Sequence, residues 1–143
     1  RTAPFNVDNC RRYCNPSIES ASDKLKADNF DNIPVLPLYP HYAAITTAST
    51  MDELGRLLSE IRNVPGIRFL RSYHDHPAYI NAIAKNVLAE WMKIGRPNFT
   101  TDKLFMTFHG LPKFHLDKGD PYHCQCHKSA RLIAEQLGAK AGH

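Results

Sequence analysis

The residues with the clearest capacity for chemistry lie in the segment Phe108-His109-Gly110-Leu111-Pro112, which follows a stretch predicted to be a buried strand. Gly110 permits unusual backbone angles and Pro112 stiffens the exit from the strand, so the imidazole of His109 is expected to be held in one orientation. Burial disfavours the charged imidazole, so His109 is predicted to stay neutral at pH 7 and to accept a proton or bind a metal ion. The alternative is a histidine that only bonds to the loop backbone.

Two other histidine clusters could ligate a metal ion, but a simpler interpretation is favoured for each. The triplet His74-Asp75-His76 precedes Pro77, which is predicted to open a helix, so helix capping is favoured there. The segment 123–127, His-Cys-Gln-Cys-His, lacks the two-residue gap of common zinc sites. A helix start in which Cys124 and Cys126 only pack is therefore preferred to a metal site.

The pair Arg12-Tyr13 lies just before a predicted helix and could bind a carboxylate. Arginine supplies a permanently charged fork of donors and tyrosine supplies a hydroxyl. Taken alone, the pair is more often an ordinary surface feature.

The elements that must position these residues alternate between helix and strand. Asn15 and Pro16 predict the N-cap and first residue of a helix over 16–29, and Thr50 to Glu53 form a predicted capping box for a helix over 50–63. Pro77 opens the strongest predicted helix, which Gly95-Arg96-Pro97 closes. Apolar residues from Ala130 to Leu137 mark a last helix that ends at Gly138.

Strands are predicted at 35–38, despite the nearby prolines, at 67–71 and at 103–108, and a loop is predicted over 109–123. This alternation is typical of an α/β protein with a doubly wound parallel sheet. Ligands of such sheets bind beyond the carboxyl ends of the strands. The segments that follow the three predicted strands contain six of the eight histidines, namely His41, His74, His76, His109, His115 and His123.

The composition limits the classes of function. With 143 residues, 43% of them hydrophobic and 22% charged, the chain can fill a core and is not predicted to be disordered. Its apolar runs are far shorter than a transmembrane helix, and its net charge of +4 is too dispersed to indicate nucleic acid. A glycine-rich phosphate loop and a Gly-x-Ser-x-Gly elbow are both absent. Four cysteines beside eight histidines favour a cytoplasmic location, and no secretory or transit signal can be read in the residues that follow Arg1.

Four segments taken together resemble ferrochelatase, the enzyme family that inserts ferrous iron into protoporphyrin. They are Arg12-Tyr13-Cys14-Asn15-Pro16-Ser17, Leu36-Pro37-Leu38-Tyr39-Pro40-His41-Tyr42, Phe108-His109-Gly110-Leu111-Pro112 and Lys118-Gly119-Asp120-Pro121-Tyr122. Their order and spacing also match those of the family, and the resemblance extends from Arg12 to Gly138.

The resemblance implies two Rossmann-like domains of the chelatase type with the porphyrin between them. Residues 1–80 would be the carboxyl-terminal part of the first domain, and residues 81–143 would begin the second. His109 matches the active-site histidine of the family, which would act on the substrate and contact the metal. The residues implied to bind the porphyrin are Arg12, Tyr13, Tyr39 and Tyr42. The implied partners are protoporphyrin and ferrous iron, in the last step of haem biosynthesis.

Departures from the family pattern qualify these expectations. Cys14 stands where the family has a small residue, and Ala44 occupies the position of the first cysteine of the animal iron-sulfur cluster, so no cluster is expected. The active-site glutamate of the family would lie beyond His143, so the isolated segment is expected to be inactive. His109 could accept a pyrrole proton, which is slightly favoured, or hold the incoming iron.

Several alternatives stay open at this point. A non-enzymatic carrier of a metal ion or a tetrapyrrole would also use histidines, whereas cobalt insertion into a sirohydrochlorin-type ring is disfavoured by the motifs. Protoporphyrin and coproporphyrin are not distinguished by the sequence. Oligomeric state and peripheral contact with a membrane surface are also open.

Overall fold

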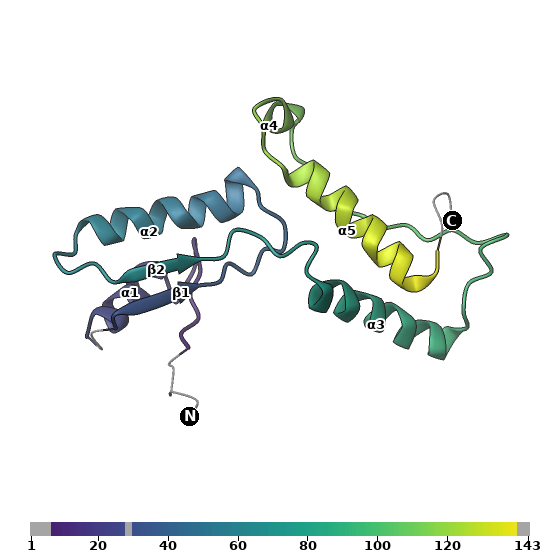
Figure 1. Ribbon diagram of the computed structural model, residues 1–143, viewed down its shortest axis with the longest axis horizontal. Coiled ribbons are helices and arrows are strands. Elements are labelled where there is room, and N and C mark those ends of the chain that lie inside the picture. Colours follow the sequence, from purple (N-terminus) through teal and green to yellow (C-terminus); the bar gives the residue numbers. More distant parts are fainter. Residues whose placement is uncertain (1–6, 28–29, 140–143) are drawn as a thin grey trace. The chain divides into compact units, whose positions relative to one another are not determined.

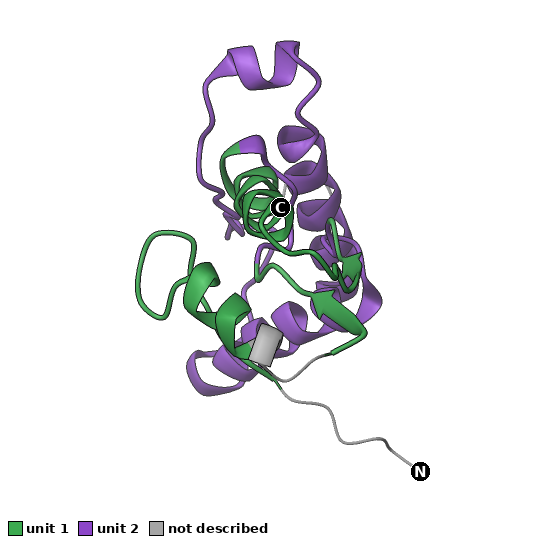
Figure 2. Ribbon diagram, turned by 90° about the vertical axis from the view of Figure 1, so that its left-hand side faces the viewer, with its two compact units in different colours: residues 1–38, 45–71 green, residues 39–44, 72–143 purple. Residues whose placement is uncertain are grey.

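The computed structural model describes residues 7–27 and 30–139, which fall into two compact units. The first unit comprises residues 1–38 and 45–71, and the second comprises residues 39–44 and 72–143 (Figure 2). Their elements in chain order are α1 (Ile18–Ala27), β1 (Asn32–Val35), η1 (Ala44–Ala48), α2 (Ser49–Ser59), β2 (Gly66–Phe69), α3 (Pro77–Ile94), α4 (Lys113–Asp117) and α5 (Tyr122–Leu137) (Figure 1). The chain thus contains both helices and strands, as the sequence predicted.

The first unit is built on a parallel pair of strands. β1 and β2 pair in register from Asn32 opposite Gly66 to Val35 opposite Phe69. α2 follows β1 and precedes β2, so a helix lies within the connection between two parallel strands, as expected of an α/β chain. This parallel pair confirms the coarse α/β assignment.

The first strand differs from its prediction in position and in burial. The apolar run from Val35 to Leu38 was expected to be a buried strand, but β1 ends at Val35, and Leu36 and Leu38 are 57% and 74% exposed. Pro37 has no N–H to donate, so the ladder cannot continue regularly through this run. Directly after the strand pair, Leu70 N donates to Val35 O at 3.0 Å, and the next backbone hydrogen bond between the two segments joins Tyr73 N to Pro40 O at 2.9 Å.

The helix starts of the first unit also correct the sequence analysis. α1 begins at Ile18, and the Ser17 hydroxyl accepts a hydrogen bond from Ser20 N at 3.1 Å, so Ser17 rather than Asn15 caps the helix. Thr50 is not an N-cap because the π-helical turn η1 runs directly into α2. Its hydroxyl instead donates to Thr46 O at 3.0 Å. The capping box is therefore wrong, and α2 ends at Ser59 rather than at residue 63.

The second unit has its core between α3 and α5, which pack against each other (Figure 1). The buried residues of this core are Ile80, Ala84, Ile133 and Leu137. α3 starts at Pro77 as predicted and ends before Gly95, whose φ of 99° suits glycine. α5 ends at the predicted Gly138, where φ is 71°.

The predicted strand over 103–108 is wrong, because this segment has no regular secondary structure. Its side chains still alternate: Leu104 and Met106 pack against the core of the second unit, while Phe105 is 84% exposed. The period-two pattern thus reflects an extended chain lying on the core without a strand partner among the described residues.

The predicted loop over 109–123 contains α4 and the start of α5. Within the described ranges, no helix combines the length and apolarity needed to cross a bilayer.

Candidate functional site

The candidate site is a hollow of about 460 Å³ in the second unit. It is lined by residues 108–113, by parts of α4 and by the first turns of α5. Four histidines contribute to its wall, namely His109, His115, His123 and His127. Imidazoles can exchange protons near neutral pH and can ligate borderline metal ions. The hollow therefore presents imidazoles, which are capable of proton transfer and of contact with a metal ion.

The position of His109 partly corrects the sequence analysis. Its side chain lines the hollow, as a site residue should, but it is exposed and does not follow a strand. The expectation that His109 is buried is wrong for this chain, because residues 103–108 run along the surface of the core instead of entering a sheet. His109 is therefore accessible to a molecule that enters the hollow.

The backbone at His109 is held by a hydrogen bond with Tyr122. The phenol oxygen of Tyr122 is hydrogen-bonded to the backbone N–H of His109 and also to the thiol of Cys126. Burial, followed by the contact with Cys126, raises the pKa of Tyr122 to about 12. The phenol therefore stays protonated at neutral pH. The neighbouring Phe108 ring meets the His41 ring edge-on, with centroids 5.5 Å apart.

Asp120 is a site residue whose role the sequence analysis missed. Its carboxylate is buried, and it accepts hydrogen bonds from Tyr122 N at 3.0 Å and from Ala44 N at 2.8 Å. His115 Nδ1 lies 3.8 Å from the same carboxylate. Asp120 thus fixes the start of α5 and a distant segment together. The available signal was an aspartate two residues before a helix start, a position that favours bonds to free helix N–H groups.

The segment 39–44, which carries Tyr39 and Tyr42, is held against α5 by two further contacts. Tyr42 N donates to the side chain of Gln125 at 2.7 Å, and His41 Nε2 lies 2.9 Å from the hydroxyl of Ser129. Gln125 and Ser129 are four residues apart and therefore share one face of the helix. Together with Asp120, these side chains hold the segment from more than 70 residues away in sequence.

The hydrogen-bond partners of Ser129 define the tautomer of His41. The Ser129 hydroxyl donates its single proton to His74 O at 2.7 Å, so it can only accept from His41. His41 therefore carries a proton on Nε2 and donates it to Ser129. Burial, and secondarily the nearby His74, lowers the pKa of His41, so the ring is neutral at pH 7.

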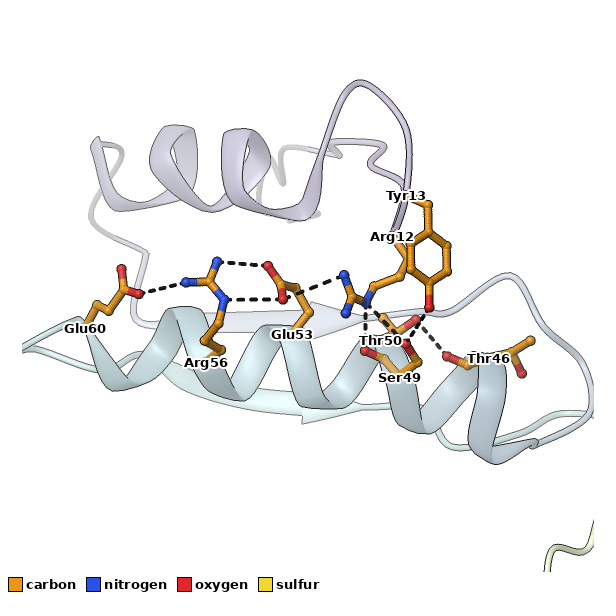
Figure 3. A network of polar contacts seen from close by, with 8 residues as sticks. All are labelled: Arg12, Tyr13, Thr46, Ser49, Thr50, Glu53, Arg56 and Glu60. Carbon is orange, nitrogen blue, oxygen red and sulfur yellow. Dashed lines mark hydrogen bonds and ion pairs between the residues drawn. The ribbon is translucent and has the colours of Figure 1, made fainter. Parts of the chain in front are cut away.

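Arg12 and Tyr13 lie together in the first unit, where they contact the start of α2 (Figure 3). Arg12 Nε donates to Ser49 O at 3.1 Å and to its hydroxyl at 3.2 Å, while a terminal nitrogen lies 3.7 Å from the carboxylate of Glu53. The Tyr13 hydroxyl is 3.1 Å from the hydroxyl of Ser49. The guanidinium also lies 4.9 Å from the centroid of the Tyr13 ring. Arg12 does bind a carboxylate, but one that belongs to its own chain.

The network around Arg12 continues along α2. Arg56 bonds to Glu53 at 2.9 Å and to Glu60 at 2.8 Å. The hydrogen bond from Arg56 is the main cause that lowers the pKa of Glu53. Glu53 is therefore ionised at neutral pH and shared between two arginines. Tyr39, Tyr42 and His109 belong to the other unit.

The remaining clusters behave as helix starts. His76 caps α3, because its Nδ1 accepts from Ala78 N at 3.2 Å, and residues 123–127 lie in the first turns of α5. All four cysteines are free, and Cys126 is buried. Across residues 7–27 and 30–139, no group of three or more His, Cys, Asp or Glu side chains could hold a metal ion. Both clusters lie at helix starts, as predicted, but the expected packing holds only for Cys126, because Cys124 is exposed.

The fold and the hollow define an α/β protein whose site offers imidazoles to a metal ion or a proton. The family model described as Ferrochelatase matches residues 1–143, and the chain belongs to the ferrochelatase family. It is 50% identical over 132 residues to the ferrochelatase of Azoarcus sp. (strain BH72), a match that covers 92% of this chain and 35% of that protein. It is 49% identical over 137 residues to the ferrochelatase of Methylobacillus flagellatus, covering 96% of this chain and 39% of that protein. The chain thus spans about a third of the length of these curated relatives.

Proposed function

We propose that this chain is the part of a ferrochelatase that supplies its reactive histidine, and that the whole protein inserts ferrous iron into protoporphyrin IX to form protohaem, the last step of haem biosynthesis. Membership of the family supports this enzymatic function over a non-enzymatic carrier. The observation that carries the proposal is the exposed imidazole of His109 on the wall of the hollow.

The reaction exchanges two pyrrole N–H protons for one Fe²⁺, and a ring twisted out of plane exposes its nitrogen lone pairs. His109 would accept a pyrrole proton, or contact the iron as it enters, since a neutral imidazole can do either. Iron is a substrate in this scheme, and no resident cofactor is proposed. Ala44 cannot ligate an iron-sulfur cluster, which agrees with this part of the proposal.

The porphyrin would be bound by Arg12, Tyr13, Tyr39 and Tyr42. Arg12 would bind a propionate, and its double use of Ser49 and Glu53 gives the guanidinium a fixed orientation for that purpose. Tyr13 and Tyr39 are 77% and 41% exposed, so their rings are accessible to a flat macrocycle, and Tyr42 would join them. This scheme assumes two Rossmann-like, doubly wound domains divided near residues 80 and 81, and a cytoplasmic location.

The proposal is tested in a chimera in which this chain replaces the matched segment of the Azoarcus ferrochelatase. Conversion of free-base protoporphyrin to metalloporphyrin is followed by visible absorption with ferrous iron under anaerobic conditions. His109→Ala should lower kcat by about 10²- to 10⁴-fold, the usual contribution of a general acid or base. His76→Asn, which retains a capping side chain outside the hollow, is the matched control.

Two outcomes would count against the proposal. Turnover of the His109→Ala chimera at the control rate would remove His109 from the reaction. A spectrum of bound free-base porphyrin that never converts, in a folded chimera supplied with iron, would favour the carrier instead.

A further inference from the structure

The hollow contains a pair of histidines that the proposed reaction at His109 does not use. His123 and His127 are four residues apart on α5, both are exposed, and both line the wall of the hollow. Their ring centroids are 4.5 Å apart and the ring planes are inclined by 67°. Residues at this spacing lie on one face of a helix, one turn apart.

We propose that His123 and His127 form a binding site for a borderline divalent cation, with both imidazoles ligating the same ion. Two histidines one helical turn apart are an established way for a helix to chelate a metal ion. Two rings that ligate one ion at about 2.1 Å have centroids roughly 4.5 to 5 Å apart, so the pair needs little rearrangement. Imidazole suits Fe²⁺, Co²⁺, Ni²⁺ and Zn²⁺, and disfavours Mg²⁺ and Ca²⁺.

Neighbouring side chains do not supply a third protein ligand. Within the described part of the chain, no third His, Cys, Asp or Glu completes a metal-binding group. The Asp120 carboxylate accepts backbone bonds from Tyr122 and Ala44, and the Cys126 thiol is buried against Tyr122. Water must therefore fill the other positions around the ion. A site with two protein ligands exchanges its ion readily, which suits transfer of a metal rather than its storage.

The shared hollow gives this site a role in the proposed function. His109 lines the same cavity of about 460 Å³, so an ion released by the pair enters the space into which the His109 side chain is exposed. The pair would thus load ferrous iron for the insertion step. This role rests on the proposed function, whereas the existence of the metal site does not.

The metal site is tested on the 143-residue chain by titration with Co²⁺ or Zn²⁺, using calorimetry and the visible absorption of bound Co²⁺. His123→Ala and His127→Ala should each weaken binding by at least about 10- to 100-fold, because a lost ligand costs no less than a lost outer-shell partner. The double variant His127→Ala with Arg131→His restores the number of histidines. It separates the two imidazoles by eight residues, about 12 Å, and should bind as weakly as His127→Ala.

Helix content and Trp91 fluorescence, measured without metal, establish that each variant is folded. Affinity that is unchanged in folded His123→Ala or His127→Ala overturns the site, and so does recovery of tight binding in the double variant. His115→Ala, which removes a different imidazole from the same hollow, should bind Co²⁺ as the wild type does, and an equal loss there would show binding that is not specific to the pair.

The loading role is tested separately in the Azoarcus chimera. His127→Ala should raise the KM for ferrous iron and leave kcat unchanged, whereas His109→Ala should lower kcat. If the 143-residue chain binds metal through the pair but the folded chimera does not turn over, the proposed function fails and the metal site stands. An unchanged iron KM in an active chimera refutes the loading role.

Discussion

At the scale of single residues, His109 is positioned through its backbone rather than through its ring. The phenol of Tyr122 holds the His109 N–H, and the Phe108 ring is packed against His41. The imidazole itself stays exposed in the hollow. This arrangement fixes the backbone that carries the ring and leaves the side chain accessible to a substrate.

Tyr122→Phe should therefore loosen the backbone at position 109 without unfolding the second unit. The variant removes the acceptor for the His109 N–H, and a typical hydrogen bond contributes about 0.5 to 1.5 kcal/mol. Amide hydrogen exchange should show faster exchange at His109, while the amides of α3 keep their rates. Tyr73→Phe is the control. Unchanged exchange at His109 in Tyr122→Phe would show that the phenol does not hold this backbone.

Ser129 attaches the segment 39–44 to α5 through its hydrogen bond with His41. It is fully buried, accepts from His41 and donates to His74 O. Ser129→Ala leaves a buried donor and a buried acceptor without this partner, which should lower the free energy of unfolding by about 1 to 3 kcal/mol. Ser59→Ala removes an exposed hydroxyl and should change it by less than about 0.5 kcal/mol. Equal effects of the two variants in urea denaturation would contradict this.

At the scale of elements, the contact between the segment 39–44 and α5 should respond to pH. The pKa of His41 is lowered by burial, so the unfolded chain binds a proton at this residue more readily than the folded chain. The contribution of His41 to stability is complete above its ordinary pKa of 6.5 and is lost as the pH falls below that value. Unfolding followed at pH 7.5 and 5.5 should show this loss. His41→Gln, which can still donate to Ser129, should reduce it, and an identical acid loss in that variant would refute the role of His41.

Two residues before α1 were candidates for its N-cap: Ser17, which caps the helix in the structure, and Asn15, which the sequence predicted. Ser17→Ala removes the acceptor for Ser20 N and should destabilise the first unit by about 1 kcal/mol. Asn15→Ala should have an effect within about 0.5 kcal/mol, because Asn15 lies outside the helix. Thermal unfolding of both variants checks the order, and a larger effect at Asn15 would restore the original prediction.

Local signals in the sequence predicted the elements whose ends depend on one residue. Pro77, Gly95 and Gly138 bound α3 and α5 as expected, because the conformational limits of proline and glycine act within a few residues. The strands were harder, because pairing depends on residues far away in the sequence: β1 pairs with β2 only from Asn32 to Val35, opposite Gly66 to Phe69. The extended run 103–108 has the alternation of a strand but lacks a partner in the part of the chain that the structure describes.

The site could be predicted only in part, because local motifs are visible in the sequence whereas long-range contacts are not. The motif around His109 indicated a reactive imidazole, and the structure places it in the hollow. Its exposure could not be predicted, since it depends on how the run 103–108 lies on the core. The contacts of Asp120 with Ala44 and of Gln125 with Tyr42 join residues 76 and 83 positions apart in the sequence. No local sequence pattern specifies contacts between residues so far apart.

At the scale of the whole molecule, the chain divides into two compact units, and the second contains its own probes of unfolding. Trp91, the single tryptophan, packs against the core of α3 and α5, and Cys126 is 5% exposed on α5. Burial raises the pKa of the Cys126 thiol, so its reactive thiolate is scarce in the folded chain. Cys14 and Cys124 are exposed.

A thiol reagent should therefore modify Cys14 and Cys124 quickly and Cys126 only after the second unit opens. Cys10 is exposed, yet partial burial and Asp8 raise the pKa of its thiol, so it should react more slowly than Cys14. In increasing urea, the rapid reaction of Cys126 and the change in Trp91 fluorescence should have the same midpoint, because both report the packing of α3 against α5. Cys126→Ala identifies the slow thiol. A urea midpoint for Cys126 clearly below that of Trp91 would contradict this. It would mean that the first turns of α5, which include Tyr122 and its hydrogen bond to His109, open before the core does.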